Sequence, residues 1–172
     1  MNAAAIITGN ICSILAMLAD SVSSTRKTRK EMLLCQSLGQ LCYCTGTIVL
    51  KGYSGAVQNA VSILRNLVAI RNMKNPFVEW FLVFLGVVLG LCFNNRGWMG
   101  LLPIIAHFQY SVAIFKCKDN ERILKTSFAI AVFLYAVFNI VLLNIVGVCT
   151  NLTVMVTTLI VLYKNRKNPK EQ

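Results

Sequence analysis

The chain has 172 residues, of which 56% are apolar or aromatic and only 13% are charged. An average soluble domain is about 25% charged, so this composition excludes an ordinary soluble globular protein. Seventeen Lys and Arg against six Asp and Glu give a net charge of +11, which must be explained by where the basic residues lie.

Apolar blocks of about 20 residues, separated by short polar segments, fill the chain from end to end. This is the length that crosses a bilayer as a helix. The pattern predicts an all-α polytopic membrane protein with no room for an extramembrane catalytic domain. The seven expected spans cover residues 3–19, 32–50, 54–70, 77–93, 98–115, 126–143 and 145–163.

Basic residues gather in alternate loops of this plan. One side has only Lys51 and Arg96. The other side has Arg26, Lys27, Arg29, Lys30, Arg71, Lys74, Lys116, Lys118, Arg122, Lys125, Lys164, Arg166, Lys167 and Lys170. Short basic loops stay in the cytoplasm, so we expect the N-terminus outside and the C-terminus inside the cell membrane. The charge is then an orientation signal, and no nucleic acid partner is expected. Residues 1–3 carry no basic residue, so we expect a retained first helix and not a signal peptide.

An internal repeat relates the two halves of the chain. A shift of 92 positions, without a gap, lays the second and third spans on the sixth and seventh. It matches Tyr43 with Tyr135, Gly55 with Gly147, Asn59 with Asn151 and Leu67 with Leu159. The chain then has a 3+1+3 plan, with three spans in each half and one span between them. The fourth span returns the chain to the side where it began, so the two halves cross the membrane in the same orientation as parallel repeats. We expect a first repeat over 1–75, a linker helix over 76–97 and a second repeat over 98–172.

The third span carries a polar stripe on one helical face, and its counterpart in the seventh span repeats the stripe. The positions are Gly55, Asn59, Ser62 and Asn66, matched by Gly147, Asn151, Val154 and Thr158. Polar groups inside a bilayer face other helices or a wet cavity. The asparagines therefore either hydrogen-bond neighbouring helices or contact a solute, and the sequence leaves both possibilities open.

Three further residues are candidates for the interior. Arg65 lies about 12 residues into its span, roughly 18 Å deep. It snorkels toward the headgroups, pairs with Asp20 or binds an anionic group. His107, near the middle of the fifth span, binds substrate, relays a proton or bonds a neighbouring helix. Pro103 acts either as a hinge or as a helix-start proline.

The sequence indicates no metal site, cofactor or enzyme. The seven cysteines and the single histidine lack metal-ligand spacing, and Cys42-Tyr43-Cys44 is one residue tighter than the common CxxC clamp. Asp20, Glu79 and His107 are too sparse for a catalytic set inside the spans.

Three short motifs resemble the YgjV family of bacterial inner membrane proteins. They are 101–105 (LLPII), 115–118 (FKCK), and 64–67 (LRNL) ending at Arg71. More remotely, the 3+1+3 plan is similar to the SWEET sugar carriers, the PQ-loop proteins and the PnuC-type vitamin carriers. The SWEET likeness implies solute contact by Asn59 and Asn151 and a hinge at Pro103. Its pocket tryptophans have no counterpart here, because Trp80 and Trp98 lie at span ends.

These features favour a transporter of a small polar solute that works by alternating access. The expected solute-binding residues are Asn59, Asn151, Arg65, Asn66, Thr158 and His107. The alternative is a membrane scaffold or sensor that transports nothing. The lipid bilayer is the expected surroundings, and association into a homo-oligomer is left open.

Overall fold

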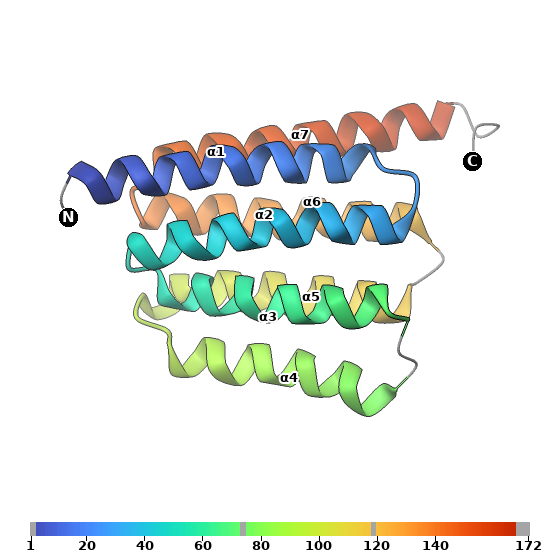
Figure 1. Ribbon diagram of the computed structural model, residues 1–172, viewed down its shortest axis with the longest axis horizontal. Helices are drawn as coiled ribbons and strands as arrows, with labels where there is room; N and C mark the ends of the chain where they lie inside the picture. Colours follow the sequence, from blue (N-terminus) through green and yellow to red (C-terminus); the bar gives the residue numbers. More distant parts are fainter. Residues whose placement is uncertain (1–2, 73–74, 118–119, 168–172) are drawn as a thin grey trace.

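The computed structural model describes residues 3–72, 75–117 and 120–167, and these residues contain seven α-helices, one 3-10 helix and no strand (Figure 1). The prediction of an all-helical protein is confirmed. In chain order the elements are α1 (Ala3–Thr25), α2 (Arg29–Val49), α3 (Tyr53–Ile70), α4 (Pro76–Cys92), η1 (Gly97–Gly100), α5 (Leu101–Lys116), α6 (Glu121–Val141) and α7 (Ile145–Lys167).

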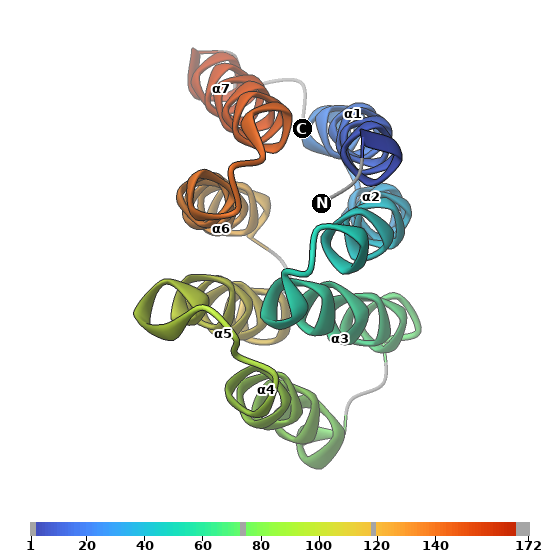
Figure 2. The same ribbon diagram turned by 90° about the vertical axis from the view of Figure 1, so that its left-hand side faces the viewer.

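Six of these helices form a ring, which is seen from its end in Figure 2. Sequential neighbours pack together as α1 with α2, α2 with α3, α5 with α6 and α6 with α7. The packing of α1 against α7 and of α3 against α5 closes the ring. Helix α4 lies outside the ring, against α3 and α5. The space at the centre is therefore bounded by helices from both halves of the chain.

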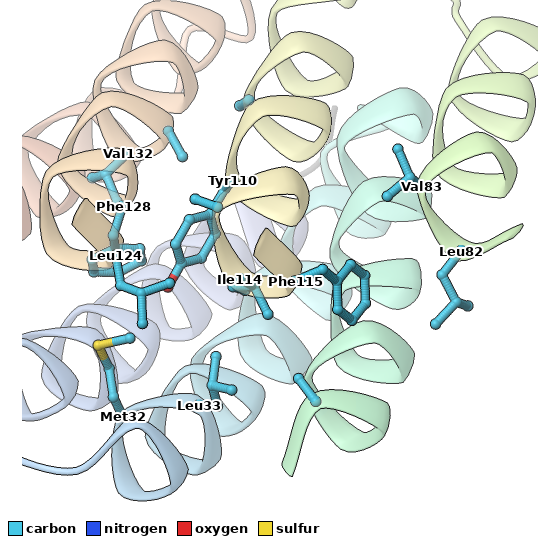
Figure 3. Close-up of a cluster of buried hydrophobic side chains, with 14 of the residues drawn as sticks. Met32, Leu33, Leu82, Val83, Tyr110, Ile114, Phe115, Leu124, Phe128 and Val132 are labelled. Atoms are coloured by element: carbon cyan, nitrogen blue, oxygen red, sulfur yellow. The ribbon is translucent and has the colours of Figure 1, made fainter. Parts of the chain in front are cut away.

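An apolar cluster fills one end of the ring (Figure 3). Met32 and Leu33 come from the start of α2, Ile114 from the end of α5, and Leu124 and Phe128 from the start of α6. Each of these side chains is at most 3% exposed. The cluster excludes water from this end of the ring.

Large apolar side chains also cover the outside of the bundle, as with Leu38 at 64% and Phe84 at 57% exposure. Five helices (α1, α2, α6, α7 and the combined η1–α5) are long and apolar enough to cross a membrane. Helix α4 has 17 residues and is about 26 Å long, slightly less than the roughly 30 Å hydrocarbon core. Helix α3 has 18 residues but buries many polar side chains.

The α2–α3 and α6–α7 turns have the same geometry, 92 positions apart. Lys51 and Leu143 both adopt left-handed backbone conformations, with φ of 57° and 54°. The amide of Gly52 bonds the Thr47 carbonyl at 2.8 Å, and the amide of Asn144 bonds the Asn139 carbonyl at 3.0 Å. This 6→1 bond closes a helix C-terminus in the Schellman manner.

Several expected boundaries were wrong. Helix α1 continues past Ala19 to Thr25, and α6 begins at Glu121, five residues before the expected start. Asn120 explains that early start, because its side chain accepts a bond from the amide of Ile123 at 3.1 Å and caps the helix. Lys125, expected in a loop, is a helical residue and is 2% exposed. Its Nζ lies 3.3 Å from Oε2 of Glu121, one helical turn earlier.

The described basic segments gather at one end of the bundle (Figure 1). The ends of α1, α3, α5 and α7 and the starts of α2 and α6 meet there, whereas Lys51 and Arg96 belong to turns at the opposite end. Helix α1 begins at one end of the bundle and α7 finishes at the other. Lys74, Lys118 and Lys170, which were part of the orientation argument, lie outside the described residues.

Candidate functional site

A cavity with many polar residues in its lining lies inside the helix ring. All six ring helices contribute to its lining, through residues such as Asp20 of α1, Tyr43 of α2, Arg65 of α3, His107 of α5 and Tyr135 of α6. Its volume, measured at the centres of water-sized spheres, is about 30 Å³. A water needs roughly 10–15 Å³ by this measure, so the space admits about two waters. A polar cavity in an apolar bundle is a candidate site for a polar solute.

The lining uses matching positions of the two chain halves. Three pairs of polar residues separated by 92 positions line the same cavity: Tyr43 with Tyr135, Thr47 with Asn139, and Asn59 with Asn151. The sequence shift had matched the first and third pairs. The shared residues are therefore gathered around one space and are not scattered over the bundle.

Arg65 points into the interior and is 1% exposed. Its Nε and Nη2 atoms donate to Oδ1 of Asn66 at 3.1 and 3.0 Å, and Nη1 donates to Oγ of Ser111 at 3.0 Å. The guanidinium also lies over the ring of Tyr110, 4.9 Å from its centroid. These bonds exclude snorkelling to the headgroups, and Asp20 is not among the partners.

His107 joins α3 and α5 beside Arg65. Its Nδ1 lies 3.1 Å from Oγ of Ser62, and its Nε2 lies 3.3 Å from Oγ of Ser111. Ser111 thereby contacts both the imidazole and the guanidinium of Arg65. Arg65 and His107 are held in one hydrogen-bonded cluster at the cavity wall. The sequence placed both residues near mid-membrane but gave no sign that Ser111 connects them.

The two asparagines line the cavity but have different partners. Oη of Tyr43 donates to Oδ1 of Asn151 at 3.1 Å, which connects α2 to α7. Asn59 is 2% exposed, and its Nδ2 group has no hydrogen-bond partner among the described residues. A buried amide donor without a partner costs roughly 1–3 kcal/mol. Asn59 is therefore ready to donate to a group placed in the cavity.

Asp20 and Gln40 line the same cavity and were absent from the expected site. Asp20 is 1% exposed, and neither its Oδ1 nor Oε1 of Gln40 has a hydrogen-bond partner among the described residues. The Asp20 carboxylate packs against Gly39 of α2, where an added Cβ would lie 2.7 Å from Oδ1. The sequence offered Asp20 only as a partner for Arg65, because a lone acidic residue near a helix end also fits the bilayer interface.

Three expected site residues do not line the cavity. Asn66 accepts bonds from Arg65 and donates to the Leu33 carbonyl at 3.4 Å, so it orients Arg65 from behind. Oγ1 of Thr158 lies 2.6 Å from Oγ of Ser24 and joins α7 to α1. Pro103 is the third residue of α5, in the first turn, where a missing amide hydrogen removes few helical bonds. This is the position of a helix-start proline, and a hinge at Pro103 stays a prediction.

Metal ligands do not gather anywhere in the described residues, which contain no group of three or more His, Cys, Asp or Glu able to hold an ion. The seven cysteines, all within the described ranges, are free.

Residues 7–169 match the family described as Imp-YgjV, bacterial inner membrane protein. The chain belongs to this family. The match spans nearly the whole chain, so Imp-YgjV membership covers every helix of the ring and every residue of the cavity. No curated protein and no solved structure matches the chain. The resemblance to the YgjV family is confirmed, and the likeness to SWEET, PQ-loop and PnuC carriers has no support from these comparisons.

Proposed function

We propose that this inner membrane protein transports a small polar solute across the bilayer by alternating access. The observation that carries the proposal is the cavity at the centre of the ring, where many buried polar side chains gather inside a bundle with an apolar exterior. Burying Arg65, Asp20, Asn59 and His107 in one place inside a membrane protein is costly. Such groups in a bundle interior mark substrate and ion pathways in transporters.

The proposed mechanism rocks two parallel three-helix repeats, α1–α3 and α5–α7, about the cavity, with α4 as the linker. Four facts support this division. The α2–α3 and α6–α7 turns share their hydrogen bonds. The first helix of each repeat packs on the third helix of the other, as α1 on α7 and α5 on α3. The cavity is lined by equivalent pairs. Helix α4 packs on the outside of the ring.

In this conformation the cavity is small. About 30 Å³ is too little for a solute of several heavy atoms, so transport requires the helices around the cavity to separate. The apolar cluster of Met32, Leu33, Ile114 and Leu124 would block the basic end. Residues Leu50, Phe138 and Leu142, each at most 6% exposed, would block the other. The structure thus fits an occluded intermediate of the proposed cycle.

Seven crossings are part of the proposal, with the basic end in the cytoplasm. The described basic residues at the ends of α1, α3, α5 and α7 support this orientation through the positive-inside rule. Short helices such as α4 are tolerated where the bilayer thins or flanking residues snorkel.

The test does not require the solute to be identified beforehand. Metabolites inside and outside the cell are compared between a deletion strain and a strain that overproduces the protein. Compounds that shift in opposite directions are then offered, radiolabelled, to liposomes containing the purified protein and the same unlabelled compound inside. Counterflow above that of empty liposomes is the expected result. A protein that moves none of them is instead a scaffold or sensor, and the transport proposal fails.

A further inference from the structure

An acidic and a basic side chain line the cavity without forming an ion pair with each other. Asp20 and Arg65 are both 1% exposed, and the described residues bring no carboxylate within ion-pair distance of Arg65 and no basic group within that distance of Asp20. An isolated buried charge costs several kcal/mol unless it is paired. Two such charges facing one cavity need an explanation beyond helix packing.

Each charge retains unused bonding capacity. The guanidinium of Arg65 has five N–H donors, and after its three bonds to Asn66 and Ser111 two donors have no partner among the described residues. On the other wall, Oδ1 of Asp20 and Oε1 of Gln40 accept no bond within the described residues. One wall therefore offers charged donors and the other offers charged and neutral acceptors.

The two charges also lie at a similar depth. Asp20 is five residues before the end of α1, and Arg65 is five residues before the end of α3, and these helices run in the same direction. At 1.5 Å per residue each charge lies about 7–8 Å from the end of its helix. Both side chains also line the one cavity, so a molecule that enters it when the surrounding helices separate can contact both.

We propose that the solute is a small zwitterion, whose carboxylate binds Arg65 and whose ammonium group binds Asp20 and Gln40. This inference rests on the proposed transport function and names its substrate class. A carboxylate accepts two parallel N–H bonds from a guanidinium, and an ammonium group supplies three donors to oxygen acceptors. Asn59 Nδ2, buried and without a partner, supplies a further donor for the carboxylate.

The test uses the full-length protein in liposomes and a panel of labelled probes of similar size. Glycine and L-alanine carry both charges, propionate carries only the carboxylate, propylamine carries only the ammonium, and glycerol is neutral. Counterflow of glycine or L-alanine at least about tenfold faster than that of the other probes is the expected result. This comparison is made on the unmodified protein and does not depend on any variant folding.

Variants then assign each charge to its end of the zwitterion. Asp20→Asn and Arg65→Gln should each slow glycine counterflow roughly tenfold or more, because each removes one charge-assisted contact. Glu31→Gln, which removes an exposed carboxylate outside the cavity, and Arg122→Gln, which removes an exposed guanidinium, are the matched controls and should transport normally. Size-exclusion profiles show whether each variant remains folded.

The outcomes separate the two proposals. Counterflow of glycerol, propionate or propylamine as fast as that of glycine would overturn the zwitterion inference and leave transport intact. Full glycine counterflow in a folded Asp20→Asn variant would overturn it as well. If no probe moves, the inference fails, and the metabolite comparison alone decides whether transport occurs.

Discussion

The phenolic oxygen of Tyr43 on α2 donates a hydrogen bond to Oδ1 of Asn151 on α7, across 3.1 Å. Both residues line the central cavity, and they belong to opposite halves of the chain. The equivalent residue of the other half, Tyr135, forms no such bond to Asn59 within the described residues, and Nδ2 of Asn59 remains without a partner. A side-chain hydrogen bond thus joins α2 to α7 across the cavity lining, and the equivalent pair on α6 and α3 has no such bond within the described residues.

Removing this bond should loosen the occluded conformation. Tyr43→Phe deletes one partly buried hydrogen bond and leaves Oδ1 of Asn151 without its donor, at a cost of about 1–2 kcal/mol. We expect a lower midpoint of thermal unfolding in detergent. Tyr135→Phe is the matched control, because it removes the same hydroxyl from the equivalent position and should shift the midpoint less. Equal shifts for the two variants would contradict a specific role for the Tyr43–Asn151 bond.

The two asparagines should be required for transport and not for folding. Asn59→Ala and Asn151→Ala each remove a buried amide from the cavity wall, and we expect counterflow to fall about tenfold or more in each. The protein should still insert and remain monodisperse. Asn165→Ala, which changes an asparagine of α7 outside the cavity, serves as the control. Unchanged transport in both cavity variants would show that neither asparagine binds the solute.

Gly86 allows α4 to approach the cavity wall closely. A Cβ at this position would collide with the imidazole of His107 and come within 3.2 Å of Oε1 of Gln58. Gln58 also donates to the Gly86 carbonyl at 2.7 Å. We expect Gly86→Ala to destabilise the protein by about 1–3 kcal/mol, measured by thermal or denaturant unfolding.

Val88→Ala is the control for this change, because Val88 lies on the same helix and is 54% exposed. Its effect should remain within about 0.5 kcal/mol. A Gly86→Ala protein as stable as the Val88→Ala protein would show that α4 does not depend on close contact with His107.

Topology gives a direct test of orientation. Fusions of a periplasm-active phosphatase and of a cytoplasm-active fluorescent protein to each terminus should report the N-terminus outside and the C-terminus inside. The basic residues at the ends of α1, α3, α5 and α7 are the physical reason for this expectation. Fusions that report both termini in one compartment would require an even number of crossings. Such a result would contradict the proposal of two parallel three-helix repeats joined by one linker helix.

The sequence determined the class of this protein because membrane helices are specified by local composition. Blocks of about 20 apolar residues need no tertiary contact to be recognised, and the seven helices fall close to the expected spans. The errors lay at helix ends, where a cap such as Asn120 carries α6 into a charged segment that composition assigned to a loop.

Only the tertiary structure decided which polar residues share the cavity. The period of α3 put Asn59, Ser62 and Asn66 on one face, but the neighbouring helices assign Asn66 to the support of Arg65 and leave Asn59 facing the cavity. Asp20 and Tyr43 were visible in the sequence, yet no local pattern states that α1 and α2 turn them toward the same space. Burial and hydrogen-bond partners depend on how helices distant in the chain pack together, and a linear pattern does not encode that packing.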